Sequence, residues 1–309
     1  MMAIRPQTDS SAKPGGAPDR PIPRWTHVLD LTKPRLSLLS VITVLVGYMA
    51  ARPAIDGATL GHLMVGTSLA AGGAAALNQW WERSTDAGMR RTRTRPLPAG
   101  HLRPGSALAA GLLLCLVGTA QLALWVNLAA ALLLAVTVSL YVLVYTPIKK
   151  RTHWCTEVGA VSGALPPAIG WAAAEGGLGP GGWILFGILA FWQMPHFHAI
   201  AWLYRRDYAA VGFPMLAVID PQGKRVGRHM TAHGLLLLLF SLGPVAFGFA
   251  GFFYGAAALI LNGLFLGRIL RFNRAGAPDD AARRIFLASL AFLPLLLGTL
   301  VIDIWFFAN

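Results

Sequence analysis

Long apolar stretches alternate with short polar segments along most of the chain. A stretch of about 20 apolar residues predicts an α-helix that crosses a membrane. Nine such stretches lie at about 36–52, 59–81, 106–124, 127–147, 157–174, 182–202, 231–250, 252–271 and 285–307. Tight turns are expected at Trp125–Asn127 and Gly251–Gly255, where the apolar run is too long for one span. The pattern therefore predicts an all-α polytopic membrane protein with nine transmembrane helices.

The positions of the basic residues give these spans a direction. Of the 26 Lys and Arg residues, all except Arg52 lie in the N-terminal segment or in the loops after the second, fourth, sixth and eighth spans. Cytoplasmic loops of membrane proteins carry an excess of Lys and Arg. The N-terminus is thus predicted in the cytoplasm and the C-terminus outside. Merging or splitting one span would destroy this pattern, so it also supports the number nine.

The composition agrees with a membrane protein and excludes other classes. Hydrophobic residues make up 55% and charged residues 13% of the 309 residues, and the mean hydropathy is +0.57. A soluble domain has about 25% charged residues, so a soluble enzyme, a disordered chain and a coiled coil are excluded. The two cysteines, Cys115 and Cys155, are too few for a disulfide framework. The net charge of +13 belongs to the loops, so no nucleic-acid partner is expected.

The polar N-terminal segment differs in composition from the rest of the chain. Residues 1–24 are rich in Pro, Gly, Ser and charge, and are predicted to be a disordered cytoplasmic tail. This segment lacks the apolar core of a secretory signal peptide. No loop is long enough to fold as a soluble domain. Residues 25–309 are therefore expected to form a single transmembrane domain, with any chemistry at the membrane surface or between helices.

Three polar side chains form a stripe at the end of the second predicted span. Asn78, Glu82 and Asp86 follow one another at intervals of four, which places them on one helical face. Two carboxylates and an amide offer the oxygen ligands that Mg²⁺ prefers. A solvated helix end is the alternative, but it accounts poorly for Asn78 and Glu82 directly after an apolar run, where polar groups are costly. We therefore predict that these three residues bind Mg²⁺.

Two basic segments offer contacts for a polyphosphate. The candidates are Arg90, Arg91 and Arg95 after the stripe, and Lys149, Lys150 and Arg151 after Tyr145 at the end of the fourth span. Guanidinium and ammonium groups bind phosphate oxygens that a metal leaves free. Anchoring of the loops at the cytoplasmic face explains the same charges and stays open as the alternative for both segments.

The end of the sixth predicted span gathers histidines, aromatic residues and one carboxylate. Gln193, His196, His198, Tyr204 and Asp207 lie close together there, with His196 and Asp207 near one helical stripe. A membrane histidine often only bonds to a neighbouring helix, but a cluster favours function. The nearby aromatic side chains form either an interfacial belt or the walls of a hydrocarbon pocket that stabilises a cation. Both interpretations stay open.

Three segments resemble motifs of the UbiA superfamily of membrane prenyltransferases, and within it the protohaem IX farnesyltransferase branch. They are NQWWERSTDAGMRRTRTRPLP, YTPIKKRTHW and WQMPHFHAIAWLYRRDYAAVGFPML, and the resemblance covers about residues 24–308. The third segment is the most specific to this branch. Glu82 stands where the superfamily commonly has Asp, and Ser84 and Arg206 stand where branch members often have an acidic residue.

The resemblance implies a UbiA-type bundle that joins farnesyl diphosphate to a vinyl group of haem b, with addition of water, to give haem O and diphosphate. Asn78, Glu82 and Asp86, with Asp207 as a weaker partner, would hold Mg²⁺ and the diphosphate. Tyr145, Gln193, His198, Tyr204 and the basic residues named above would contact the substrates. His196 would bind the haem iron or form a hydrogen bond near the vinyl group, and is preferred to His198.

Two other functions compete with this expectation. One is UbiA-type transfer to another aromatic acceptor, such as a quinone precursor, and the other is a transporter without catalysis. The middles of the spans carry hardly any charge, which disfavours a transporter. The lipid bilayer, farnesyl diphosphate and haem b are the expected partners, and a haem A synthase is a further candidate. A bacterial plasma membrane is the expected location, with the mitochondrial inner membrane as the alternative.

Overall fold

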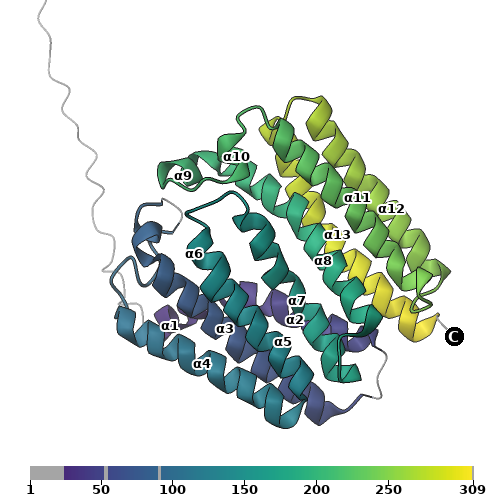
Figure 1. Ribbon diagram of the computed structural model, residues 1–309, viewed down its shortest axis with the longest axis horizontal. Coiled ribbons are helices and arrows are strands. Elements are labelled where there is room, and N and C mark those ends of the chain that lie inside the picture. Colours follow the sequence, from purple (N-terminus) through teal and green to yellow (C-terminus); the bar gives the residue numbers. More distant parts are fainter. Residues whose placement is uncertain (1–23, 52–54, 90–91, 308–309) are drawn as a thin grey trace, which may run out of the picture.

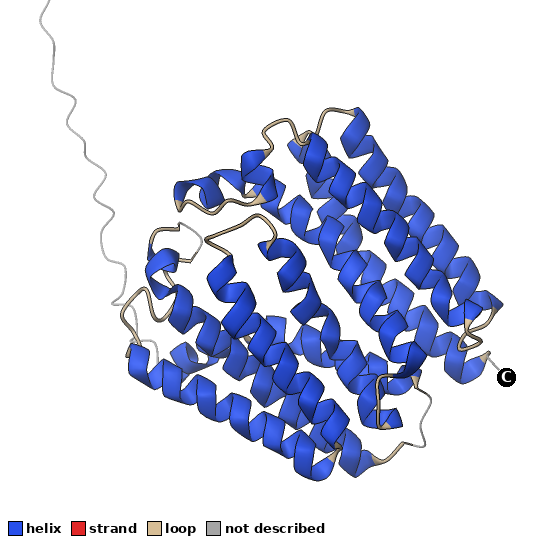
Figure 2. Cartoon of the chain, viewed as in Figure 1, coloured by secondary structure: helices blue, strands red, loops and turns tan. Residues whose placement is uncertain are grey.

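A computed structural model describes residues 24–51, 55–89 and 92–307, and in this part of the chain every regular element is a helix (Figure 2). The helices are α1 (Arg24–Thr32), α2 (Pro34–Ala50), α3 (Gly57–Ala87), α4 (Pro104–Trp125), α5 (Leu128–Ser139), the π-helical segment η1 (Leu140–Tyr145), α6 (Thr146–Ile148), α7 (Cys155–Glu175), α8 (Gly179–Leu203), α9 (Arg205–Ala210), α10 (Leu216–Ile219), α11 (Lys224–Ala246), α12 (Phe252–Arg274) and α13 (Asp279–Phe306). The predicted tail lies outside the described residues, except for Arg24.

The apolar lengths of these helices confirm the membrane class. Within the described residues, 7 helical stretches are long and apolar enough to cross a membrane: 57–87, 104–125, 128–148, 179–203, 224–246, 252–274 and 279–306. Helix α2 is apolar but has only 17 residues, and α7 is not among the 7. Both nevertheless coincide with predicted spans. The chain is thus an all-α, multi-pass membrane protein, while the number nine and the positions of the termini stay predictions.

Capping side chains form both of the tight turns that the sequence predicts. Asn127 caps α5 by accepting a hydrogen bond from the Ala130 backbone N–H (2.8 Å). At the start of α12, the buried Asp303 carboxylate accepts hydrogen bonds from the backbone N–H groups of Gly251 and Tyr254. These side chains satisfy backbone donors that the first turn of a helix leaves without partners.

The helices form two groups that meet along α7 and α8. Helices α2–α7 lie on one side, and α8 and α11–α13 on the other (Figure 1). The short helices α9 and α10 lie at one end of the bundle (Figure 1). The largest buried apolar cluster belongs mainly to the second group, with Leu237, Phe265 and Leu296 among its members. The segments that follow α3, α6 and α8 lie at the same end of the bundle, because Met89, Cys155 and Phe213 pack against one another.

Two glycines allow α2 and α7 to approach closely. A Cβ atom at Gly47 would overlap the Pro167 backbone, and one at Gly170 would overlap the Val44 carbonyl oxygen. Small residues that bring helix backbones together are a common basis of packing in membranes. This contact holds α7 in place, and the first turn of α7 lies beside the polar residues described below.

Replacing Gly170 with Ala is expected to destabilise the protein by about 1–3 kcal/mol, because the added methyl group has no room between the two backbones. The matched control is Gly263→Ala in α12, where nothing lies within 4 Å of the added Cβ atom. Thermal unfolding of the detergent-solubilised chain should show a lower Tm for the first variant only. Equal melting of Gly170→Ala and the unchanged chain would contradict this packing.

Candidate functional site

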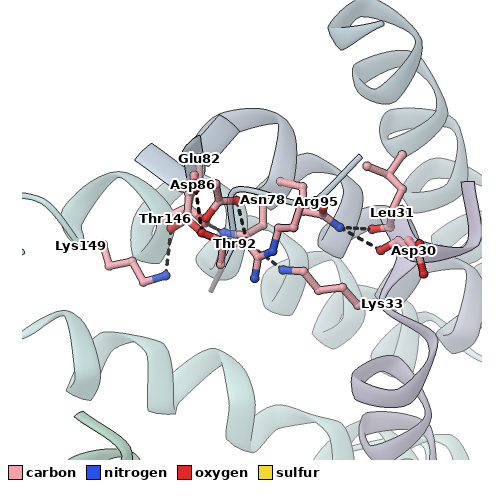
Figure 3. A network of polar contacts seen from close by, with 11 residues as sticks. Asp30, Leu31, Lys33, Asn78, Glu82, Asp86, Thr92, Arg95, Thr146 and Lys149 are labelled. Atoms are coloured by element: carbon pink, nitrogen blue, oxygen red, sulfur yellow. Dashed lines mark hydrogen bonds and ion pairs between the residues drawn. The ribbon is translucent and has the colours of Figure 1, made fainter. Parts of the chain in front are cut away.

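The predicted polar stripe is buried at the end of α3. Asn78, Glu82 and Asp86 are exposed by only 2%, 6% and 0%, although they lie near the end of a helix. Figure 3 shows the three side chains together, with basic side chains on either side of them. A merely solvated helix end would leave such groups in water. The structure therefore favours the functional interpretation of the stripe.

Each member of the stripe bonds to a basic side chain from a different segment. The pairs are Lys33 Nζ to Asn78 Oδ1 (3.0 Å), Lys149 Nζ to Glu82 Oε1 (2.9 Å) and Arg95 to Asp86 Oδ2 (2.6 Å). These basic residues precede α2, follow α6 and follow α3. Buried charges are stable only when they are paired in this way. The site is thus a compact assembly of oxygen ligands and cations.

Lys33 is a site residue that sequence reasoning missed. In the sequence it is one of the basic residues whose positions orient the spans. Its backbone is left-handed (φ 47°), a conformation that costs a non-glycine residue about 1–2 kcal/mol. Burial, together with a smaller effect of the nearby Arg95 guanidinium, lowers the pKa of Lys33 to about 7. The available signal was a lysine directly before Pro34, at the start of an apolar helix.

The end of the stripe leaves one oxygen for a ligand. Thr92 donates a hydrogen bond to the Asp86 backbone carbonyl (2.9 Å), which fixes the turn after α3. Asp86 Oδ1 is buried and has no hydrogen-bond partner among the described residues. A buried carboxylate oxygen without a partner is costly unless a ligand satisfies it. Together with the oxygens of Asn78 and Glu82, it fits the preference of Mg²⁺ for oxygen ligands.

The second basic segment contributes one residue to this network. Lys149 lies over the rings of Tyr145 (5.1 Å) and Phe213 (5.8 Å) in addition to its bond with Glu82. Its neighbours Lys150 and Arg151 are exposed and make no ion pair within the described part of the chain. Arg90 and Arg91, predicted as diphosphate contacts, lie outside the described residues.

Thr146 is a second partner of Asn78 that sequence reasoning missed. Its hydroxyl accepts a hydrogen bond from Asn78 Nδ2 (3.1 Å) and donates one to the Tyr141 carbonyl (2.8 Å). Tyr141 lies in the π-helical segment, where the regular backbone pattern is interrupted. Thr146 therefore fixes the orientation of the Asn78 amide, so that its oxygen faces Lys33. A threonine next to a proline carries no distinctive signal in the sequence.

The sixth-span cluster divides between two sides of α8. His196 Nδ1 lies 2.7 Å from Ser289 Oγ in α13, and its ring stacks on Trp192 at 4.9 Å. His198 faces α7 and α11 instead, beside His229 (5.8 Å between ring centroids). Gln193 bonds to the Leu189 carbonyl (3.1 Å) in its own helix. The structure therefore does not unite these three residues at one point.

The predicted helical stripe from His196 to Asp207 is wrong. Helix α8 ends at Leu203, Tyr204 leaves the helical conformation (φ −104°, ψ 18°), and α9 begins at Arg205. Asp207 is half-buried and has no ion-pair or hydrogen-bond partner among the residues the structure describes. Tyr204 is exposed. The break changes the direction of the chain, so spacing along a single helix does not apply.

The loop after α9 nevertheless reaches the carboxylate site. Phe213 and Met215 pack with Met89 and Cys155 in a buried cluster, which Tyr145 and Tyr208 border. This cluster joins the first, second and third sequence segments at one end of the bundle. A surface groove of about 500 Å³ between α12 and α13 is lined by Arg268, Arg271 and Arg284, and contains none of the predicted site residues.

Comparison with known proteins identifies relatives across most of the chain. The sequence profile of the UbiA prenyltransferase family matches residues 40–290. The protoheme IX farnesyltransferase of Opitutus terrae is 50% identical over 280 residues, which cover 91% of this chain and 95% of that protein. The protein of the same name from Solibacter usitatus is 42% identical over 287 residues, which cover 89% and 97%.

Solved structures share the fold at low identity. A digeranylgeranylglyceryl phosphate synthase superposes with a TM-score of 0.79 at 16% identity, covering 91% of this chain and 98% of that one. A UbiA homolog from Archaeoglobus fulgidus, bound to GPP and Mg²⁺, superposes with a TM-score of 0.59 at 12% identity, covering 89% and 99%.

Proposed function

Since the chain belongs to the UbiA prenyltransferase family, we propose that it transfers a farnesyl group from farnesyl diphosphate to a vinyl group of haem b. Water adds in the same reaction, and haem O and diphosphate are released. The names of relatives that are 50% and 42% identical over most of the chain support this donor and acceptor. A bacterial plasma membrane and a single transmembrane domain of residues 25–309 belong to the same proposal.

The observation that carries the proposal is the buried stripe of Asn78, Glu82 and Asp86, opposed by cations. Asp86 Oδ1 has no partner among the described residues, and three basic side chains lie within 3.0 Å of the oxygens of the stripe. Mg²⁺ bound by the three oxygens would neutralise the charge that develops on the diphosphate. A transporter would not need such a paired site at one end of the bundle.

The basic residues are proposed to exchange partners when the donor binds. Arg95 and Lys149 now neutralise the two carboxylates of the stripe, and Lys33 donates a hydrogen bond to the Asn78 amide oxygen. Phosphate oxygens offer all three basic groups stronger, charge-assisted bonds. They would hold the leaving group while the allylic C–O bond breaks, because positive charge then develops on carbon and negative charge on diphosphate. Lys150 and Arg151, which are exposed, fit loop anchoring better than substrate contact.

Formation of the new C–C bond requires that the protein orient the farnesyl group and the haem, but it does not require a nucleophilic side chain. The terminal vinyl carbon forms the new C–C bond, and water then attacks the adjacent carbon and loses a proton. A vinyl group is a weak nucleophile, so the two partners must be held close together. His196 is proposed to face the haem, either through iron or through a hydrogen bond. Its contact with Ser289 holds the ring in place. Asp207 and Tyr204 are proposed to border the donor site.

Haem extraction tests the proposal directly. The chain is expressed in a host without its own haem O synthase, and membrane haems are separated and weighed by mass spectrometry. A species with the mass of haem b plus a farnesyl group and water is expected. If haem b is unchanged and the protein instead prenylates 4-hydroxybenzoate, the acceptor is an aromatic compound other than haem b. No release of diphosphate from farnesyl diphosphate by folded protein would contradict prenyl transfer altogether.

Replacing Lys33 with Met is expected to raise the KM for farnesyl diphosphate by about 10-fold or more, because a hydrogen bond to a charged group contributes about 1.5–3 kcal/mol. The matched control is Arg35→Met, since Arg35 is exposed two positions along the chain. A Lys33→Gly variant removes the charge and also relieves the left-handed backbone. An unchanged KM in both Lys33 variants would show that this ammonium group does not contact the donor.

A further inference from the structure

Three side chains from separate helices converge at the end of the bundle that also carries the carboxylate stripe. Glu157 lies in the first turn of α7, His198 near the end of α8 and His229 in the second turn of α11. One ligand atom of each lies within 4.8 Å of those of the other two. Glu157 belongs to this group, whereas Cys155, two positions earlier, belongs to the buried cluster with Met89 and Phe213. The group is thus separate from the Asn78–Asp86 stripe.

The polar atoms of this group lack hydrogen-bond partners. Among the described residues, His198 Nε2, His229 Nδ1 and both Glu157 carboxylate oxygens are buried and form no hydrogen bond. His229 Nδ1 and Glu157 Oε1 are 3.5 Å apart. His198 is exposed by only 1%, so water does not compensate its ring nitrogen. Orphaned buried polar atoms are rare, and several of them within 4.8 Å of one another are typical of a ligand-binding site.

The chemistry of these atoms selects the kind of ligand. Two imidazole nitrogens and one carboxylate form a common ligand set for Zn²⁺, which binds nitrogen and oxygen at about 2.0–2.2 Å. Mg²⁺ prefers oxygen ligands alone, which the stripe provides instead. The mutual spacing fits a small ion. A porphyrin would have to enter between side chains that already lie within 4.8 Å of one another.

We propose that Glu157, His198 and His229 bind a divalent transition-metal ion of the Zn²⁺ type. The ion would join α7 to α8 and α11, and so tie the two helix groups together at the end of the bundle that carries the stripe. The Glu157 and His229 side chains are 20% and 28% exposed, which leaves a path for the ion. This role replaces the substrate contact that the sequence predicts for His198, and it does not depend on the proposed function.

Metal content and thermal unfolding of the full chain test this site. The chain is purified in detergent with a tag that lacks histidine, stripped with a chelator and titrated with Zn²⁺. We expect one Zn²⁺ per chain and a Tm that rises with Zn²⁺ but not with the same concentration of Mg²⁺. Loading with Co²⁺ should give the visible absorption bands of a tetrahedral site. A chain that neither binds Zn²⁺ nor gains stability from it would overturn the proposal.

Variants identify the ligands. Glu157→Gln and His229→Gln are expected to weaken Zn²⁺ binding by at least about 10-fold, since even residues that only orient a ligand contribute about that much. The matched control is His233→Gln, one turn further along α11, which stacks on His229 at 6.1 Å but lies outside the group. Unchanged binding in both ligand variants, or an equal loss in the control, would refute the assignment. If the variants fail to fold, the titration of the unchanged chain still decides the proposal.

Discussion

Replacing Asp86 with Asn is expected to reduce haem O formation by about 1,000-fold or more while the protein still inserts into the membrane. The change removes one of the two carboxylates that would hold Mg²⁺, at a position whose second oxygen is buried without a hydrogen-bond partner among the described residues. Loss of a single preorganised group that stabilises a developing charge costs about 100–1,000-fold, and loss of a metal ligand affects both metal binding and charge. The amide keeps the shape of the side chain, so α3 should still pack.

The control for this variant is Asp280→Asn. Asp280 is an exposed carboxylate that pairs with Arg284 in the first turn of α13, outside the stripe. Its loss should leave haem O formation unchanged. Haem O is measured by mass spectrometry at equal protein level, and Mg²⁺ is titrated in parallel. A normal rate in Asp86→Asn at the usual Mg²⁺ concentration would contradict the assignment of the stripe.

The fold could be predicted well because membrane helices leave a strong one-dimensional signal. Each predicted apolar stretch coincides with a helix, and the turns at Asn127 and Gly251 were visible as polar or glycine breaks. The polar ends of helices were less predictable. Helix α11 begins at Lys224 rather than at 231, because its first two turns carry charged residues and lie beyond the apolar run.

The candidate site could be predicted only where one helix carries it. Asn78, Glu82 and Asp86 share a face because of their spacing, and the structure shows this face buried. Contacts between distant segments could not be predicted from the sequence. Lys33 and Thr146 reach Asn78 only because the helices that carry them pack together. These contacts carry no local pattern that distinguishes them from an anchoring lysine or an ordinary threonine.

The histidines show the opposite case, since residues that are close in the sequence do not lie close together in space. Residues two positions apart on a helix point to different sides. His196 therefore meets Ser289, and His198 meets His229, 31 positions further along the chain. His229 follows several basic residues, and Glu157 lies at the start of an apolar stretch. In the sequence, each therefore resembles an ordinary residue of the protein surface. Only the packing of α7, α8 and α11 shows them as one group.

Replacing Lys149 with Met is expected to lower kcat/KM for farnesyl diphosphate by about 100–1,000-fold, because this ammonium group would stabilise the leaving diphosphate. Lys150→Met is the matched control, since its side chain is exposed and unpaired within the described part of the chain. The two lysines are neighbours with the same charge. A purely electrostatic anchoring role would make both variants equally active.

Stability separates the catalytic effect of Lys149 from its structural one. The variant leaves Glu82 buried without its cation, and breaking a buried pair in this way costs about 3–5 kcal/mol. Adding Glu82→Gln removes the uncompensated charge, so the double variant should regain most of the lost Tm. It should not regain activity, because both the cation and a metal ligand are then absent. Recovery of activity together with the Tm would mean that Lys149 acts only by keeping Glu82 paired.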